Sequence, residues 1–170
     1  MKKLLYLFFL SVMLLCLAGC SKSSAGSNAI ETETMDFPTE ASTAPVSQPL
    51  SYSIYIPNAT ADSFETEIIH TDTISADTVL SELIKRNVLP NTVSINSFEM
   101  DNGMIRADFN QAFADVVCSM GTSGEFMIVG SVVNTFLDAF QAESIIFTVD
   151  GEILESGHTI YDFSMTFFDL

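Results

Sequence analysis

The stretch TSGEFMIVGSVVNTFLDAF, residues 122–140, has the strongest helical pattern in the chain. Its large apolar residues recur every three or four positions, the spacing that places side chains on one face of an α-helix. Thr122 and Glu125 stand three residues apart at its start, which predicts a capping box. We therefore expect a long helix that buries one apolar face over about four turns. That face would consist of Phe126, Val129, Val133, Phe136, Leu137 and Phe140.

Two polar residues lie among these apolar ones, namely Asn134 and Thr135. A buried amide that finds no hydrogen-bond partner costs about 1–3 kcal/mol, so both side chains need partners if this part of the helix is buried. We expect them to bond a neighbouring strand or loop, and we favour this structural role over ligand binding.

β-Hairpins are predicted on both sides of this helix. Before it, MIRADF (residues 104–109) alternates apolar and polar residues, and Asn102-Gly103 joins it to a strand over 93–99. After it, SIIFTVDGEI (residues 144–153) has strand character with Asp150-Gly151 as the turn. Asn-Gly and Asp-Gly favour the tight two-residue turns of hairpins because both turn positions need positive φ.

Less regular segments adjoin these elements. Asn110 is placed to cap a short helix before the long one. That short helix would carry Ala112, Phe113, Val116 and Val117 on its apolar side. YDFSMTFF, residues 161–168, predicts a last strand through Phe163, Met165 and Phe167. His158 lies in the loop before it, and a lone histidine is a poor candidate for a metal ligand or a proton donor.

The first part of the folded region predicts two strands and a helix. LSYSIYIP (residues 50–57) alternates apolar and polar residues, and FETEIIH (residues 64–70) is expected to pair with it. ISADTVLSELIKRN (residues 74–87) has helical spacing, with Ser75 as its cap, and Pro90 prevents its continuation.

The resulting order is strand, strand, helix, strand, strand, helix, strand, strand. This order predicts an α+β fold: a mixed, mostly antiparallel sheet with two main helices on one face, resembling a split βαβ unit.

The amino-terminal residues predict a secretory signal. Lys2 and Lys3 precede the apolar run 4–17, which is shorter than the roughly 20 residues of a membrane-spanning helix. LAGC, residues 17–20, resembles the lipobox of bacterial lipoproteins. That resemblance implies a signal peptide over 1–19, cleavage before Cys20, and acylation of the Cys20 thiol.

Residues 21–49 are rich in Ser, Thr, Ala, Glu and Pro and contain few large apolar residues. Such a composition buries too little surface to offset the entropy lost on ordering. We therefore expect residues 20–49 to be the acylated cysteine and a disordered linker with a reach of about 30 Å. Residues 50–170 are expected to form one globular domain.

The net charge of −16 would become −18 after loss of residues 1–19, which contain two lysines and no acid. So negative a surface is repelled by nucleic acid and by anionic lipid, so we exclude nucleic-acid partners. The lipid on Cys20 would then hold the protein at its membrane.

Enzymatic motifs are weak throughout the chain. GTSG, residues 121–124, is one residue short of a nucleophile elbow and lacks the strand that such an elbow follows. Cys118 would be the only thiol left after processing, and we expect it to be a small core residue rather than a nucleophile. No phosphate loop and no metal-ligand cluster is present in the sequence. We therefore predict no catalytic residues, no metal and no cofactor.

Several short motifs together resemble the GerMN domain of bacterial lipoproteins tied to sporulation and spore germination. They are LPNT (89–92), ADFN (107–110), VVNTF (132–136), FTVDG (147–151) and GH (157–158). This chain departs from the family in having Phe136, where the Asn-Thr pair is usually followed by leucine. It also has room for one domain, whereas some relatives carry two.

The resemblance implies a non-catalytic envelope module with a topology similar to the ring-building domains of secretion and sporulation channels. Its motifs make Asp108, Asp150, Gly151 and His158 candidate structural or interaction residues, beside Asn134 and Thr135. It also implies a protein on the extracytoplasmic face of the cell membrane of a Gram-positive spore former.

Two functions remain open at this point. The first is an interaction module that docks onto an envelope protein, while the sequence names neither the partner nor the oligomeric state. The alternative is a module that binds peptidoglycan or another small envelope ligand. That alternative needs a concave cleft with aromatic stacking, for which Tyr52, Tyr55 and Tyr161 are candidates.

Overall fold

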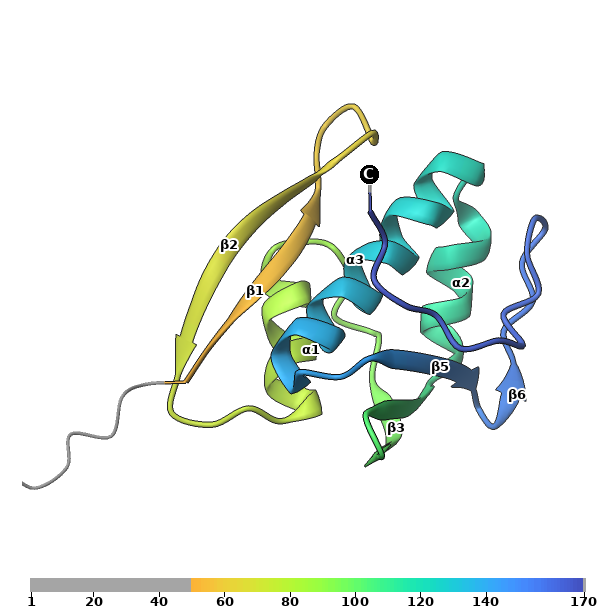
Figure 1. The fold of residues 1–170 in the computed structure, drawn as a ribbon. Helices are drawn as coiled ribbons and strands as arrows, with labels where there is room; N and C mark the ends of the chain where they lie inside the picture. The colour runs from red at the N-terminus through yellow and green to blue at the C-terminus, as the bar shows by residue number, and fades with distance from the viewer. Residues whose placement is uncertain (1–49, 170) are drawn as a thin grey trace, which may run out of the picture. The chain divides into compact units, whose positions relative to one another are not determined.

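The computed structural model describes residues 50–169. The expected signal peptide, the lipidated Cys20 and the linker lie outside the described residues. Within them the chain runs as follows: β1 (Leu50–Pro57), β2 (Phe64–Thr71), α1 (Ala76–Lys85), β3 (Ile95–Asp101), β4 (Met104–Phe109), α2 (Gln111–Ser119), α3 (Thr122–Phe140), β5 (Ser144–Val149) and β6 (Glu152–Ile153). Figure 1 shows their arrangement.

The strands form two sheets. β1 and β2 make a two-stranded antiparallel ribbon. The other strands lie in the order β3-β4-β5-β6, with β4 and β5 parallel and the remaining pairs antiparallel. The predicted α+β class is therefore confirmed. The predicted single sheet is wrong, because the described strands form two sheets. The two main helices and the short helix before the long one are all present, as α1, α3 and α2.

Helix α3 is the centre of the fold and explains why the sheets are separate. It contacts β1, β5, α1 and α2, and nearly all its residues from Met127 to Ala139 are buried. Figure 1 shows it running between the β1–β2 ribbon and α2. Polar side chains of α3 bond the edge of β1 that faces away from β2, so that edge is occupied by a helix instead of another strand.

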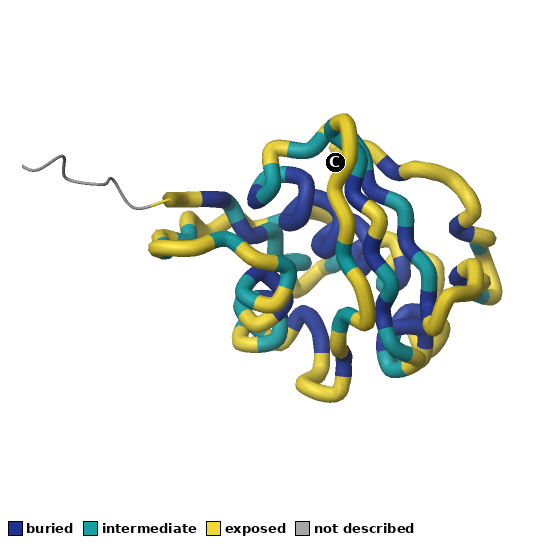
Figure 2. The backbone as a smooth tube through the Cα atoms, turned by 90° about the horizontal axis from the view of Figure 1, so that it is seen from below, coloured by how far each residue is buried: buried dark blue, intermediate teal, exposed yellow. Residues whose placement is uncertain are grey.

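The core is built on aromatic residues. The rings of Phe109 and Phe113 stack with centroids 4.4 Å apart, and Phe147 meets Phe109 edge-on at 5.4 Å. Phe136 of α3 is fully buried beside them, 6.3 Å from Phe109. Burial alternates along β4 and β5 because one face of this sheet meets the helices. Figure 2 colours the described chain by burial.

Both predicted hairpin turns are confirmed. Asn102 and Gly103 have φ of 49° and 78°, and Asp150 and Gly151 have φ of 49° and 83°. Positive φ at both central positions is the property that makes Asn-Gly and Asp-Gly suited to these turns.

The helix starts agree only in part with the prediction. Ser75 caps α1 as expected, in a capping box with Thr78. The capping box at Thr122 is wrong: Gly121 is the N-cap of α3 without a side-chain bond, and the Glu125 carboxylate bonds a later loop. Asn110 is the N-cap residue of α2 as predicted, but its side chain makes no capping bond, because its amide bonds the Thr92 carbonyl and the Ser94 N–H instead.

Two further expectations are wrong. Residues 161–168 form no strand, since a single bridge joins Met165 to Ile145, and Phe163 and Phe167 are exposed. Cys118 is exposed rather than buried, because α2 turns Phe113, Ala114 and Val117 inward and Cys118 lies at the margin of that buried face.

Candidate interaction surface

A row of polar side chains on α3 closes one edge of the β1–β2 ribbon. The Tyr55 N–H donates to Thr135 Oγ1 at 3.1 Å, and the Ser131 hydroxyl donates to the Tyr55 carbonyl. One turn further along α3, the Ser53 N–H donates to the Asp138 carboxylate. Residues 131, 135 and 138 are three or four apart, so they share one helix face and act together as a substitute for a neighbouring strand.

Asn134 holds the C-terminal segment to the same helix. Its amide nitrogen donates to the Phe168 carbonyl at 3.0 Å, and its amide oxygen accepts from the Phe168 N–H at 2.7 Å. Asn134 and Thr135 are both 0% exposed, and no buried side-chain nitrogen or oxygen within residues 50–169 lacks a partner. The polar side-chain atoms of both residues therefore form hydrogen bonds within the fold.

Asp108, at the end of β4, organises the turn after β5. Its Oδ1 accepts from the Thr148 hydroxyl at 2.6 Å and from the Gly151 N–H at 2.8 Å. Asn96 donates to Asp108 Oδ2 at 3.0 Å and to Asp150 Oδ1 at 2.9 Å. The hydrogen bond from Thr148, followed by those from Gly151 and Asn96, outweighs burial and lowers the pKa of Asp108. The sequence had indicated neither Asn96 nor Thr148 as members of this group.

His158 belongs to a third group, centred on Glu125. Glu125 is 2% exposed. Its Oε1 accepts from the Ser156 hydroxyl at 2.6 Å and from the Tyr161 hydroxyl at 2.7 Å, and its Oε2 lies 2.8 Å from His158 Nδ1. Sequence reasoning assigned Glu125 to a capping box and missed this group, although its position four residues before Val129 on the apolar face was a signal of burial.

The protonation of this group follows from its contacts. Burial alone raises the pKa of Glu125, but hydrogen bonds from Ser156, Tyr161 and His158 outweigh it and lower that pKa. Burial, and then the bond to Glu125, raise the pKa of Tyr161. An ionised carboxylate therefore fastens the loop 156–161 to the first turn of α3.

The six candidates do not form one site. Asn134 and Thr135 face the C-terminal segment and β1, while Asp108, Asp150 and Gly151 meet at the end of β4. His158 lies at the start of α3. Within the described residues no group of three or more His, Cys, Asp or Glu side chains is placed to hold a metal ion.

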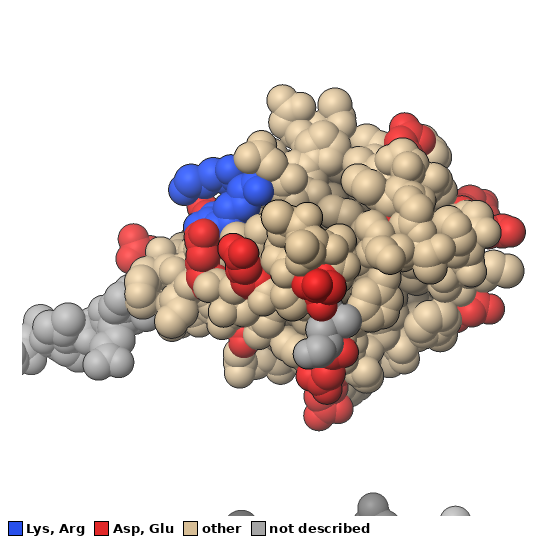
Figure 3. Space-filling model, turned by 90° about the horizontal axis from the view of Figure 1, so that it is seen from above, with Lys and Arg blue, Asp and Glu red and all other residues tan. Residues whose placement is uncertain are grey.

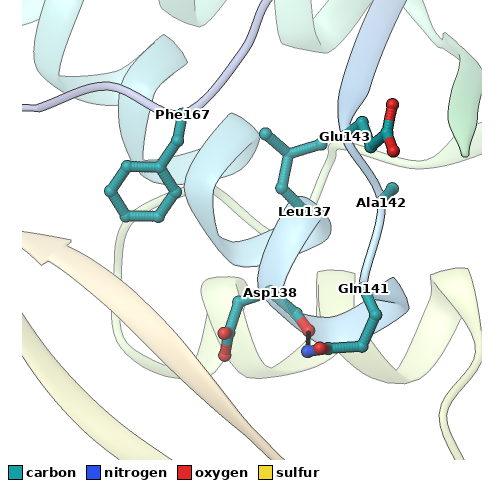
Figure 4. Close-up of a pocket in the computed structure, with 6 residues that line it drawn as sticks. All are labelled: Leu137, Asp138, Gln141, Ala142, Glu143 and Phe167. Atoms are coloured by element: carbon teal, nitrogen blue, oxygen red, sulfur yellow. Dashed lines mark hydrogen bonds between the residues drawn. The ribbon is translucent and has the colours of Figure 1, made fainter.

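The surface hollows are shallow. One of about 280 Å³ lies at the end of α3, where Figure 4 shows Phe167 and Asp138 among its lining side chains and the Gln141 amide bonded to the Asp138 carbonyl. Another of about 290 Å³ lies on the outer face of the four-stranded sheet around Arg106, Asp108 and Ile146.

Two of the three tyrosines expected for ligand stacking are buried. Tyr52 and Tyr161 are buried, at 4% and 5% exposure, so their rings are inaccessible to a sugar. Tyr55 meets Phe64 and Phe167 edge-on, and these three rings line a hollow of about 210 Å³ together with Phe168. Of the three tyrosines, Tyr55 is therefore the one whose ring borders a surface hollow.

Charge and apolar exposure mark the surface instead. Acidic residues are spread over the face in Figure 3, whereas the basic residues gather at one spot. Lys85 pairs with Glu82, and Arg86 pairs with Glu82 and, at 2.7 Å, with Glu67. Arg106, on the outer sheet face, is the remaining basic residue of the described chain. Among all the described residues, the most exposed large apolar side chains are those of Ile68, Ile153 and Ile160, at 68%, 56% and 53%.

No helix within residues 50–169 combines the length and apolarity needed to cross a bilayer.

Comparison with known proteins gives one family match. The model of the Germane family, described as sporulation and spore germination, matches residues 53–155. These residues run from β1 to just beyond β6. No curated protein matches the chain significantly.

Several solved structures are similar to the chain. A presumed lipoprotein of Clostridium perfringens is 14% identical, with 70% of this chain and 88% of that chain covered and a TM-score of 0.47. The first GerMN domain of the sporulation protein GerM from Bacillus subtilis is 17% identical, with 69% and 96% covered and a TM-score of 0.48. The tandem GerMN domains of the same protein are 15% identical, with 76% and 49% covered and a TM-score of 0.45.

Proposed function

The chain belongs to the Germane family of sporulation and spore germination domains, and from this membership we propose that it is a non-catalytic interaction module of the bacterial envelope. The module would be held on the extracytoplasmic face of the cell membrane by the acylated Cys20. It would dock onto an envelope protein that takes part in sporulation or spore germination.

The observation that carries the proposal is the order of parts in the sequence. A basic start, a short apolar run and LAGC at 17–20 precede a polar linker and then the single family domain. Each buried methylene of an acyl chain such as palmitate is worth about 0.8 kcal/mol, and two chains anchor a protein stably where one does not. The linker would let the domain move within about 30 Å of its anchor.

The non-catalytic part of the proposal is supported by how polar groups are used. Glu125, Asp108 and Asn134 each bond several partners within the fold, and these bonds hold turns and segments in place. A catalytic acid or base would need a side chain that points into a cleft and can reach a substrate there. The surface is then the part of the domain that is available for function.

The test is affinity capture of the full acylated chain after reversible cross-linking in membranes of sporulating cells. The proposal expects one envelope protein to be recovered in constant ratio to the chain. The Cys20→Ala chain, matched in expression, should lose that protein together with its membrane association.

The peptidoglycan-binding alternative has a different outcome. Cosedimentation of the chain with purified wall material, at an ionic strength that screens charge repulsion, and no recovered protein would overturn the proposal in favour of that alternative. Recovery of the envelope partner without wall binding would exclude the alternative.

A further inference from the structure

The β1–β2 ribbon has one closed edge and one open edge. In an antiparallel strand the N–H and C=O of one residue point to the same side, and successive residues alternate between the two sides. Ser53 and Tyr55 point theirs towards α3, where Asp138, Thr135 and Ser131 bond them. Tyr52, Ile54 and Ile56 must therefore direct their backbone N–H and C=O groups towards β2.

The register then shows which groups of β2 are free. Ile54 lies opposite Glu67, and Tyr52 lies opposite Ile69, so Glu67 and Ile69 direct their backbone groups towards β1. The alternate residues of β2 direct theirs outward; these are Phe64, Thr66, Ile68 and His70. β2 ends its sheet, and within residues 50–169 no further strand pairs with it, as Figure 1 shows.

This open edge has properties that folded proteins normally suppress. An unpaired strand invites pairing with another chain and is usually shortened, bulged, or protected by proline or by charged side chains, lysine above all. β2 is eight residues long, pairs with β1 without a register shift, and contains neither lysine nor proline; its two acids, Glu65 and Glu67, lie before Ile68. Ile68, at its middle, is 68% exposed, more than any other large apolar side chain of the described residues.

We propose that β2 pairs antiparallel with β2 of a second copy of this chain, about a two-fold axis at Ile68. In this register Ile68 lies opposite Ile68 of the second copy, and Thr66 lies opposite its His70. All of these residues have outward backbone groups, so each pair exchanges hydrogen bonds. The two ribbons become one four-stranded antiparallel sheet, and each copy covers the exposed isoleucine of the other.

Charge and the exposed isoleucine together favour this register. With the axis at Ile68, Glu67 lies opposite Ile69 of the second copy and Glu65 lies opposite its Thr71, so no acid faces an acid. Moving the axis to Glu67 would place that residue directly opposite Glu67 of the second copy, and moving the axis to Thr66 would place Glu67 opposite Glu65, which destabilises a sheet. The axis at Ile68 avoids both contacts and sets the two exposed isoleucines against each other.

The proposed membrane anchor would favour the same contact. Two copies tethered to one membrane meet at a higher effective concentration than free copies do, which compensates in part for their like net charge. This step alone rests on the proposed function. The strand geometry is independent of it.

Cysteine cross-linking in membranes tests the pairing. The full chain would carry Cys118→Ser, which removes an exposed thiol, together with Ile68→Cys. Directly opposite residues of a hydrogen-bonded antiparallel pair have Cα atoms about 5.5 Å apart, within reach of a short thiol-reactive cross-linker. Ile153→Cys and Ile160→Cys are matched controls, because their exposures of 56% and 53% are close to that of Ile68.

The pairing predicts a cross-linked product of twice the chain's mass for Ile68→Cys and little product for the two controls. The yield should increase with salt, because screening weakens the repulsion between two copies that each carry a net charge of −16 before processing. Equal yields at all three positions, no product at Ile68, or a product containing a different protein would each overturn the proposal.

Proline substitutions give a second test. Thr66→Pro removes an outward N–H, so it should abolish cross-linking at Ile68 and leave the melting temperature nearly unchanged. Glu67→Pro removes an N–H that bonds β1 and should lower the melting temperature. Retention of the cross-link in a folded Thr66→Pro chain would overturn the strand pairing.

Failure of the anchor and failure of the pairing give different results. If the anchor proposal is wrong, the chain appears in the medium, and the Cys20→Ala chain still forms dimers with rising concentration in sedimentation experiments. If the pairing is wrong, the Cys20→Ala chain stays monomeric at every concentration, whatever its location in the cell.

Discussion

Glu125 is the one acidic side chain that the fold buries within residues 50–169. It lies on the apolar face of α3, where a carboxylate is costly unless hydrogen bonds compensate for lost water. Ser156, Tyr161 and His158 provide them from a loop more than thirty residues later. The sequence predicted a capping role for Glu125, and its true partners could not be predicted because nothing local in the sequence pairs that loop with α3.

Glu125→Gln is expected to lower the free energy of unfolding at pH 7 by about 1–3 kcal/mol, because the charged acceptor of three donors is lost. The pKa of Glu125 is lowered from 4.5 in the folded state, so its contribution is fully present above that value and is lost as the pH falls through the lower folded pKa. The difference between wild type and variant should therefore shrink in acid. Denaturant unfolding from pH 7 to pH 3 measures it.

The exposed Glu152→Gln on β6 serves as the control for this experiment, since it also removes one acid. It should change stability little at any pH. An equal loss in the two variants, or a difference for Glu125→Gln that does not depend on pH, would contradict the role assigned to the buried carboxylate.

Gly103 and Gly157 can be compared by substitution, because of the two only Gly103 has a positive φ. Gly103 has φ of 78°, a region that costs an L-residue about 1–2 kcal/mol, so Gly103→Val should destabilise the chain by at least this amount. An alanine Cβ at Gly157 would meet no atom within 4 Å in the described structure, so Gly157→Ala should be nearly neutral. Thermal unfolding compares them, and an unchanged melting temperature for Gly103→Val would contradict the turn geometry.

At the level of elements, local patterns predicted most of the fold. Period-two alternation found β1 and β4, Asn-Gly and Asp-Gly found the two turns, and helical spacing found α3. The strand predicted over residues 161–168 was wrong because an alternating pattern does not show whether the edge of another strand is available for pairing. Asn134 fixes the end of that segment to α3 through Phe168, and only Met165 reaches β5.

The division into two sheets could not be predicted from the same patterns. It depends on Ser131, Thr135 and Asp138 occupying the edge of β1, which is a contact between residues about eighty positions apart along the chain. A polar residue on an apolar helix predicts that some partner exists. It does not predict that the partner is the backbone of a strand.

Thr135→Val tests the joint between α3 and the ribbon. Valine has nearly the same shape as threonine but offers no acceptor, so the Tyr55 N–H loses its partner at a cost of about 1–3 kcal/mol. Hydrogen exchange should show faster exchange at Tyr55. Thr135→Ser keeps the hydroxyl and should preserve slow exchange there, and equal behaviour of the two variants would contradict the joint.

For the whole molecule, composition and motif order predicted more than local structure did. The family domain lies where the composition changes from polar linker to alternating apolar sequence, and the family model covers residues 53–155. The candidate residues were harder to interpret, because their motifs proved to stabilise turns and segments at three separate places. Which surface binds a partner depends on exposed edges, and periodicity in one chain does not reveal these.

The anchor gives a prediction at this scale. Cys20→Ala should move the chain from the membrane fraction to the medium, because the proposed acyl chains would be absent and the charge is repelled by anionic lipid. Cys118→Ser is the matched control, since it also removes a cysteine but should leave the chain in the membrane fraction. Immunoblots of both fractions measure the distribution, and membrane retention of the Cys20→Ala chain would contradict the anchor.

Mass spectrometry of the amino-terminal peptide from the native protein is the sharpest test of the lipid anchor. The mature chain is expected to begin at Cys20, and this residue is expected to carry a diacylglyceryl group. An unmodified Cys20, or a chain that begins elsewhere and is found free outside the cell, would contradict the lipid anchor.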